Sequence, residues 1–95
     1  MSDGLKLLGK IDIPTAGTRV QLTTTRLMAK SIRIEADEDN GAGIVFVGDA
    51  TVSGDLYAAR LAANESFTIS GSAIDPRTIW LDTDLSGSDV QVSWL

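Results

Sequence analysis

The chain has 95 residues, enough for one domain with a small core, and its net charge is −5. It contains no cysteine and no histidine, which excludes disulfides, thiolate metal sites and the commonest general base. The acidic balance and the scattered basic residues argue against nucleic acid and against a membrane as partners. Because there is no long apolar run and no secretory signal, we expect a soluble protein, and nothing in the sequence predicts a cofactor.

The first half of the chain consists of short β-branched runs separated by turn residues. In the run at 30–36, Ile32 and Ile34 alternate with polar residues, which is typical of a strand with one buried face. The Asn40-Gly41 pair that follows is the strongest β-hairpin signal in the chain. The run at 44–48 is apolar on both faces, as expected of a central strand or of one covered by a partner. The expected strands of this half are 5–13, 18–22, 30–36 and 44–48.

The second half continues the same pattern. Residues 56–63 have some helical composition but are too short for a helix with a clear apolar stripe, so we interpret them as a strand. Phe67 and Ile69 share one face of the next run. Near the C-terminus, Trp94 shares a face with two valines and is predicted to lie in the core. The expected strands of this half are 56–63, 66–70, 77–82 and 90–95, with loops at 49–55 and 71–76.

Short strands recur at intervals of roughly 8–12 residues, and no segment is a convincing helix. The pattern therefore predicts an all-β fold, a small antiparallel β-sandwich or jelly roll of about seven or eight strands that forms a single domain over 1–95. Residues 1–4 are expected to form a loose N-terminal arm. The last strand reaches Leu95, so the C-terminus is expected to be tied into a sheet.

The segment DTDLSGSD, from Asp82 to Asp89, begins like a calcium-binding loop. An EF-hand loop ends with a bidentate glutamate at position 12, but here that position is Ser93, inside a predicted strand. Asp and Ser also accept hydrogen bonds from nearby backbone in ordinary turns, and Gly87 suits the positive φ of a hairpin. We interpret the segment as a turn between two strands, not as a metal site.

The densest acidic run is EADEDNG at 35–41. Its carboxylates at Glu35, Asp37 and Asp39 offer a possible site for a divalent cation at a subunit contact. The alternative is a solvated hairpin tip whose charge discourages association with other sheet edges. We favour the hairpin tip and assign no metal-binding residue.

The remaining acidic residues give no sign of catalysis. Asp49, Asp55, Glu65 and Asp75 stand singly in separate predicted loops, and nothing in the sequence brings two of them to one cleft. No nucleophile elbow and no phosphate-binding loop is present. We therefore expect that the protein is not an enzyme and assign no catalytic residue.

Several large apolar side chains are better explained by contacts with a partner. Trp80 alternates with Ile79 and Leu81, so it is either an exposed ring that binds a sugar or a subunit, or part of a second core face. Tyr57 and its neighbour Leu56 follow the doubly apolar run, and the N-terminal leucines are too apolar for a free tail. The candidate interface residues are Leu5, Leu7, Leu8, Phe46, Tyr57 and Trp80.

Four blocks follow one another along the middle of the chain: TAGTRVQLTTT (15–25), SIRIEA (31–36), NGAGIVFVGDATVSG (40–54) and ARLAANESFTI (59–69). Their order resembles that of small virion proteins of tailed bacteriophages. These are turn and strand motifs, not catalytic ones. Asn64 stands where glycine is usual in that family, and asparagine also tolerates a left-handed turn conformation.

The resemblance implies a β-sandwich that is a building block of a virus particle, assembled in the host cytoplasm and found in the virion. One role it implies is a capsid decoration (cement) protein, a homo-oligomer and often a trimer, that binds the major capsid protein and stabilises the head. The other is a structural component of the neck, tail or baseplate. The residues leave a further alternative, a carbohydrate-binding surface module that uses Trp80 or Tyr57 as a stacking platform.

Overall fold

The computed structural model describes residues 5–95, and the expected arm at 1–4 lies outside them. The chain forms two antiparallel sheets of four strands each, which confirms the predicted small all-β sandwich. The strands are β1 (Lys6–Ile13), β2 (Val20–Gln21), β3 (Ala29–Ala36), β4 (Val45–Gly48), β5 (Ala59–Leu61), β6 (Ser66–Ile74), β7 (Trp80–Thr83) and β8 (Ser88–Trp94), and the 3-10 turns are η1 (Glu38–Asn40) and η2 (Pro76–Thr78).

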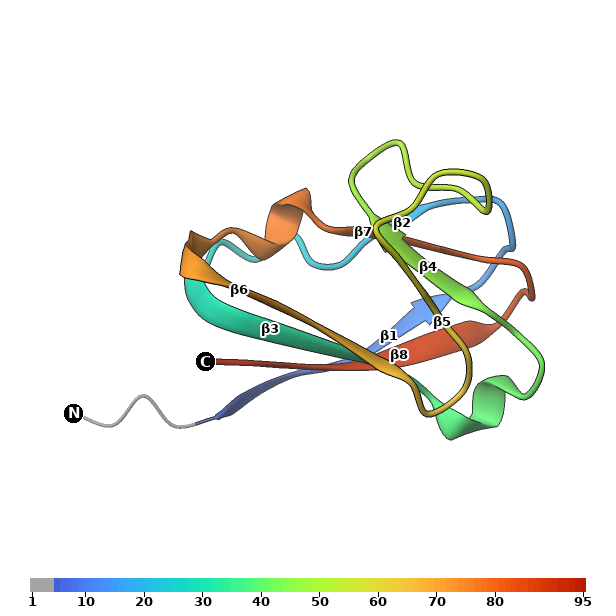
Figure 1. The fold of residues 1–95 in the computed structure, drawn as a ribbon, viewed down its shortest axis with the longest axis horizontal. Helices are drawn as coiled ribbons and strands as arrows, with labels where there is room; N and C mark the ends of the chain where they lie inside the picture. The colour runs from blue at the N-terminus through green and yellow to red at the C-terminus, as the bar shows by residue number, and fades with distance from the viewer. Residues whose placement is uncertain (1–4) are drawn as a thin grey trace.

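The strand order is that of a jelly roll. The first sheet has the order β1-β8-β3-β6 and the second sheet the order β2-β7-β4-β5 (Figure 1). The first strand therefore pairs with the last, the second with the seventh, the third with the sixth and the fourth with the fifth. This is the arrangement produced when a long antiparallel pair of chain segments is rolled into two layers.

This topology shows that the hairpin predicted at Asn40-Gly41 is wrong. The Asn40-Gly41 segment joins β3 in the first sheet to β4 in the second, so it is a crossing between layers. The turn at 84–87 likewise carries the chain from β7 to β8, which also lie in different sheets. Turn residues mark where a strand ends, but they do not say whether the next strand pairs with it or crosses to the other layer.

The core lies between the two sheets and follows the predicted alternation. Ile32 and Ile34 of β3 are fully buried, and the exposed Arg33 lies between them in sequence. Trp94 is partly buried and packs against this core, as predicted. The other fully buried side chains of the core include Ile13, Leu22, Val45, Val47, Leu81 and Val90.

Several strand boundaries differ from the prediction. β2 has only two residues and β5 only three, whereas β6 continues to Ile74 through the expected loop at 71–76. The expected strand at 77–82 is divided, because Asp75 caps the 3-10 turn η2 and Pro76 begins it. Among residues 5–95, no helix is long and apolar enough to cross a membrane.

The C-terminus is tied into the first sheet, as expected. The Leu95 amide donates to the Ser31 carbonyl at 3.0 Å, and the Lys30 amide donates to the Leu95 carbonyl at 2.7 Å. Lys6, at the start of β1, lies opposite Trp94, so β1 begins at the end of the molecule where the chain finishes (Figure 1).

Candidate binding surfaces

The first candidate surface consists of Leu5 and Leu7, which we call the N-terminal apolar surface. Leu5 is 66% exposed and Leu7 81% exposed, and β1 is an edge strand of the first sheet. Leu8 instead packs against the core, because a β-bulge between Leu7 and Gly9 shifts the register with β8. Gly9 adopts a φ of +113°, a conformation that only glycine adopts easily. The structure thus separates three leucines that the sequence presents together.

A shallow pocket adjoins the N-terminal apolar surface. Its volume is about 250 Å³, and the two exposed leucines line one side of it. Arg33, Gln91 and Ser93, on the outer face of the first sheet, line the other side. An apolar side with a polar floor suits a protein side chain that carries both characters.

The loop between β4 and β5, residues 49–58, explains why β4 is apolar on both faces. Val45 and Val47 face the core, whereas Phe46 faces outward yet is only 7% exposed. The loop folds back over this outer face: Val52 is buried, and its carbonyl accepts a hydrogen bond from Arg19 Nη1 at 3.3 Å. Phe46 is therefore covered by its own chain, and a partner would meet the loop rather than the Phe46 ring.

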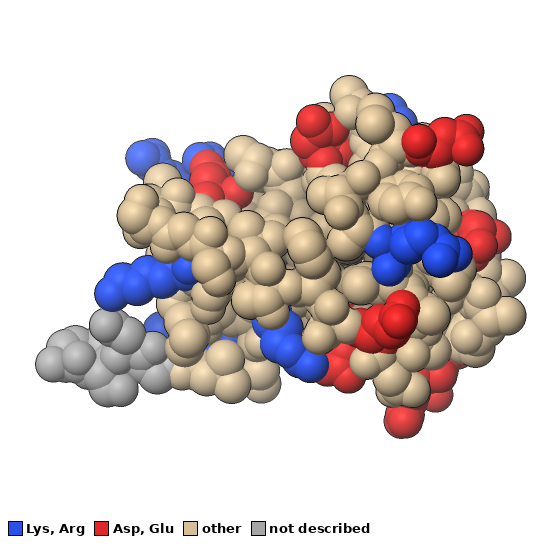
Figure 2. Space-filling view, in the orientation of Figure 1, with Lys and Arg blue, Asp and Glu red and all other residues tan. Residues whose placement is uncertain are grey.

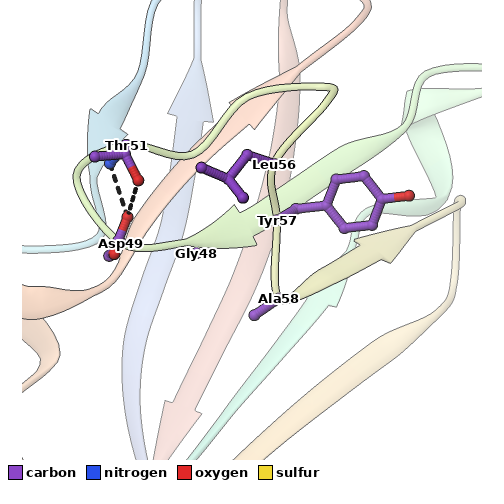
Figure 3. A pocket seen from close by; sticks show the side chains of 6 residues that line it. All are labelled: Gly48, Asp49, Thr51, Leu56, Tyr57 and Ala58. Carbon is purple, nitrogen blue, oxygen red and sulfur yellow. Dashed lines mark hydrogen bonds between the residues drawn. The ribbon is translucent and has the colours of Figure 1, made fainter.

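The second candidate surface lies on this loop, and we call it the Leu56–Tyr57 surface. Leu56 is 59% exposed and Tyr57 is 42% exposed. The Tyr57 ring stacks on Phe46, and its other face remains open. Figure 3 shows the adjoining pocket, of about 230 Å³, with Leu56 between Tyr57 and the hydrogen-bonded pair Asp49–Thr51.

Asp49 fixes the conformation of this loop. Its Oδ1 accepts hydrogen bonds from the Thr51 hydroxyl at 2.5 Å and from the Thr51 amide at 2.8 Å. These two bonds, the hydroxyl contributing more, lower the pKa of Asp49 below its ordinary value. The carboxylate thus acts as a turn-stabilising acceptor at the rim of the pocket.

Trp80 lies on the outer face of the second sheet and is half-buried. Its neighbours in sequence, Ile79 and Leu81, are buried in the core, so the indole projects away from it. Across the sheet it lies opposite Gln21 of β2 and Gly48 of β4. Of the two alternatives for Trp80, the structure places it on the outer face and not between the sheets.

The DTDLSGSD segment holds other loops in place. Asp82 is 3% exposed, and its Oδ1 accepts hydrogen bonds from the amides of Gly17 at 3.0 Å and Thr83 at 2.8 Å. Asp84 Oδ1 accepts from the Ile44 amide, and Ser86 Oγ accepts from the Ala16 amide, both at 2.8 Å. The segment is a turn, with Gly87 at a φ of +87°. Its oxygens bind backbone amides from two other connections of the jelly roll.

The acidic run at 35–41 is also engaged with its own chain. Glu35 pairs with Arg33 at 2.7 Å. Asp37 caps η1 by accepting from the Asp39 amide at 3.0 Å, and its Oδ2 accepts from Gln91 Nε2 at 2.9 Å. These two hydrogen bonds lower the pKa of Asp37. Within residues 5–95, no three acidic side chains converge as a metal site.

Lys10 joins this acidic turn to β8. Its Nζ lies 3.3 Å from Asp89 Oδ2 and 3.7 Å from Asp37 Oδ2. The hydrogen bond with Asp89, followed by the charges of Asp89 and Asp37, raises the pKa of Lys10. The ion pairs brace the crossing between β3 and β4 against the first sheet.

Of the remaining singly placed acids, two stabilise local turns. Glu65 Oε1 accepts from the Ala62 amide at 2.7 Å. Asp75 Oδ2 lies 2.7 Å from Arg77 Nη2, and the hydrogen bonds from Arg77 lower the pKa of Asp75 from 3.8 to about 2. Asp55 is exposed in the β4–β5 loop. Figure 2 shows acidic side chains mainly over the half of the molecule that carries η1, and basic ones mainly toward the opposite end.

Three exposed apolar residues were not singled out from the sequence: Met28 at 57%, Leu85 at 48% and Leu95 at 44%. Each lies outside the strands, where no alternation reports which side is buried. Comparison of the chain with protein-family models, curated proteins and solved structures finds no match.

Proposed function

We propose that this chain is a structural protein of a tailed-bacteriophage particle, and specifically a capsid decoration protein that stabilises the head by binding the major capsid protein. The observation that carries the proposal is the exposure of Leu5, just before β1, and Leu7, on β1, at 66% and 81%; β1 is an edge strand of the jelly roll. Burying one such leucine against a partner is worth about 1.5–3 kcal/mol. The proposed work of the protein is binding, and it includes no catalytic step.

Three further features support this role. The jelly roll is an architecture that viral capsid proteins use, although a fold by itself does not define a function. The sequence blocks at 15–69 resemble those of small phage virion proteins. Many copies on one shell would add their individually modest contacts through avidity.

The test uses heads of the phage that encodes the protein. Leu5→Asp with Leu7→Asp places charge on the N-terminal apolar surface, and Thr24→Asp, at another exposed position, is the matched control. We expect the double variant to leave heads sparsely decorated, so that they release DNA at a lower temperature, while the control behaves as wild type. Full occupancy by the double variant, with an unchanged melting temperature of the free protein, would contradict the proposal.

A position in the neck, tail or baseplate would use the same surfaces in another part of the virion. Cryo-EM of intact particles separates the two positions, because a decoration protein follows the icosahedral lattice of the shell. Density confined to the tail would replace the decoration role with the tail role.

A second candidate function, carbohydrate binding, is favoured by the Leu56–Tyr57 surface. The exposed face of the Tyr57 ring adjoins a pocket that also contains Asp49 and Thr51, a combination of stacking and polar groups that suits a sugar. A glycan array should then detect a ligand for wild type that Tyr57→Ala loses. Trp80→Ala tests the other aromatic ring on this side of the sandwich. Absence of binding to any glycan would remove this function.

A further inference from the structure

The β6 strand forms an open edge of the first sheet. It pairs with β3 on one side, and no other strand of residues 5–95 pairs with its second side. Among the backbone hydrogen bonds of the described chain, none links Ser66–Ile74 to a segment beyond that edge. β6 has nine residues, which makes it the longest strand of the molecule.

This edge lacks the protection that sheet edges usually carry. Natural edge strands are blunted by charged residues, prolines or bulges that prevent pairing with another chain. The opposite edge strand of the same sheet, β1, carries two of these protections: the charged residues Lys6 and Lys10, and the bulge at Gly9. β6, with the sequence SFTISGSAI, has neither charge nor proline, and its register shift lies beyond Ser70. The stretch Ser66–Ser70 is therefore a regular, uncharged and open edge.

The hydrogen bonds of Ala36 show which backbone groups face outward. The Ala36 amide donates to the Glu65 carbonyl at 2.8 Å, and the Asn64 amide donates to the Ala36 carbonyl at 2.9 Å, so Ala36 faces β6. Backbone groups alternate in direction along an antiparallel strand. Phe67, opposite Ile34, and Ile69, opposite Ile32, therefore face β3 with their backbone groups. The amides and carbonyls of Ser66, Thr68 and Ser70 point to the open edge.

We propose that two copies of this chain associate by antiparallel pairing of their β6 strands, with the two-fold axis at Thr68. The sequence Ser-Phe-Thr-Ile-Ser keeps the same order of polarity when read in reverse. A two-fold axis at Thr68 places threonine opposite threonine, Ser66 opposite Ser70, and Phe67 opposite Ile69. Threonine pairs, and pairs of an aromatic with a β-branched residue, are favourable across antiparallel strands.

Self-complementarity is what identifies a second copy as the occupant. The outward backbone groups of Ser66, Thr68 and Ser70 meet the same groups of the partner in hydrogen-bonded register. No charged residue lies within the paired stretch, so no like charges are brought together. Phe67 and Ile69 are only partly buried in one copy, and each gains an apolar neighbour in the pair.

The contact is isologous, so it closes as a dimer; a trimer needs two different surfaces that fit each other. The inference rests on the open edge of β6 and on its self-complementary sequence, and not on the proposed capsid binding. It is tested on purified protein without phage heads, so its failure would leave the head-decoration test unaffected, and the reverse also holds.

Single cysteines test the register, because the natural chain has none. Thr68 lies opposite its own copy, about 5.5 Å away between Cα atoms, which is within the range of a disulfide of about 4.4–6.8 Å. Thr68→Cys should therefore form a covalent dimer on mild oxidation. Ser70→Cys alone should not form one, because Ser70 lies roughly 14 Å along the strands from Ser70 of the other copy. Ser66→Cys combined with Ser70→Cys should form one, because these two positions lie opposite each other in the pair. Thr24→Cys is the control, and it measures how much disulfide-linked dimer forms by random collision of two molecules.

Introduction of a charged residue tests the same contact without a covalent cross-link. Thr68→Lys places two ammonium groups together on the axis, while Ser72→Lys changes the same strand beyond the paired stretch. In sedimentation velocity, wild type and Ser72→Lys should populate a dimer that Thr68→Lys loses, with all three keeping the far-UV spectrum of the folded sandwich. A monomer or trimer for wild type, or a dimer unaffected by Thr68→Lys, would overturn the proposal, as would equal cross-linking at positions 68, 70 and 24.

Discussion

The Tyr57 ring stacks on the Phe46 ring, with the centroids 5.4 Å apart and the ring planes inclined by 29°. Tyr57 lies near the end of the loop at 49–58, and Phe46 projects from the outer face of β4, so this contact fastens the loop to the second sheet. The Phe46–Tyr57 pair lies between the interior of the molecule and the Leu56–Tyr57 surface. Changes at this point therefore affect stability and surface chemistry together.

Removing the Tyr57 ring should destabilise the fold. Tyr57→Ala uncovers one face of Phe46, and the lost stacking alone should lower the free energy of unfolding by about 1 kcal/mol. Tyr57→Phe keeps the stacked ring and should stay close to wild type. Urea unfolding of the three proteins provides the comparison, and equal midpoints for Ala and wild type would show that the loop is held by other contacts.

Truncating the Asp82 side chain should lower the stability of the fold by more than the small size of this side chain suggests. Asp82→Ala leaves the amides of Gly17 and Thr83 without the carboxylate acceptor they share. Gly17 is exposed and its amide also donates to the Thr83 carbonyl at 3.3 Å, so the loss falls mainly on the Thr83 amide, and we expect a decrease in stability of about 1 kcal/mol. Asp82→Asn retains an oxygen at Oδ1 and should lose less. Chemical denaturation measures both variants; an equal loss for the two would assign the effect to charge, not to the hydrogen bonds.

Calcium should leave the thermal stability unchanged. The oxygens of Asp82, Asp84 and Ser86 already accept hydrogen bonds from backbone amides, so an ion would have to displace those contacts. Melting curves with calcium chloride in excess and with chelator should superimpose. A rise in melting temperature with calcium but not with magnesium would show a specific site and refute the turn interpretation.

The pair Asp75–Arg77 should contribute to the acid sensitivity of the fold. Because folding lowers the pKa of Asp75 from 3.8 to about 2, the contribution of the pair is complete above pH 4 and is lost as the pH falls toward 2. Asp75→Asn should therefore show a shallower loss of stability across this window than wild type. Arg77→Gln removes the main cause of the shift and should flatten the profile in the same way. Wild-type slopes in both variants, measured by urea unfolding at several pH values, would contradict this assignment.

Residues on regular strands were predicted well. The alternation of Ile32, Arg33 and Ile34 gave both the strand and its buried face, and Trp94 packs against the core as expected. Phe67 and Ile69 share a face, as predicted, and the structure shows that this face packs against the core. Predictions were less accurate where one sequence pattern is compatible with several local structures. Residues 71–74 contain turn-forming residues but extend β6, because β3 offers them a pairing partner at Ala29.

The structure exposes only some of the candidate interface residues. Leu5, Leu7 and Tyr57 are exposed as an interface requires, whereas Leu8 and Phe46 are covered by the rest of the chain. Nothing local distinguishes Leu7 from Leu8; the bulge against β8 decides which of them faces solvent. Phe46 is covered because a loop beyond its own strand folds back over it.

The amino-acid sequence by itself determined the all-β class, the faces of the longer strands and the lack of cysteine and histidine chemistry, since these depend on composition and on a two-residue period. Only the tertiary structure decided which strands pair. In a jelly roll the first strand meets the last and most turns cross between layers, so register depends on contacts between residues as distant as Lys6 and Trp94. Local turn signals carry no information about such contacts, because chain entropy and packing of the whole core select the partner.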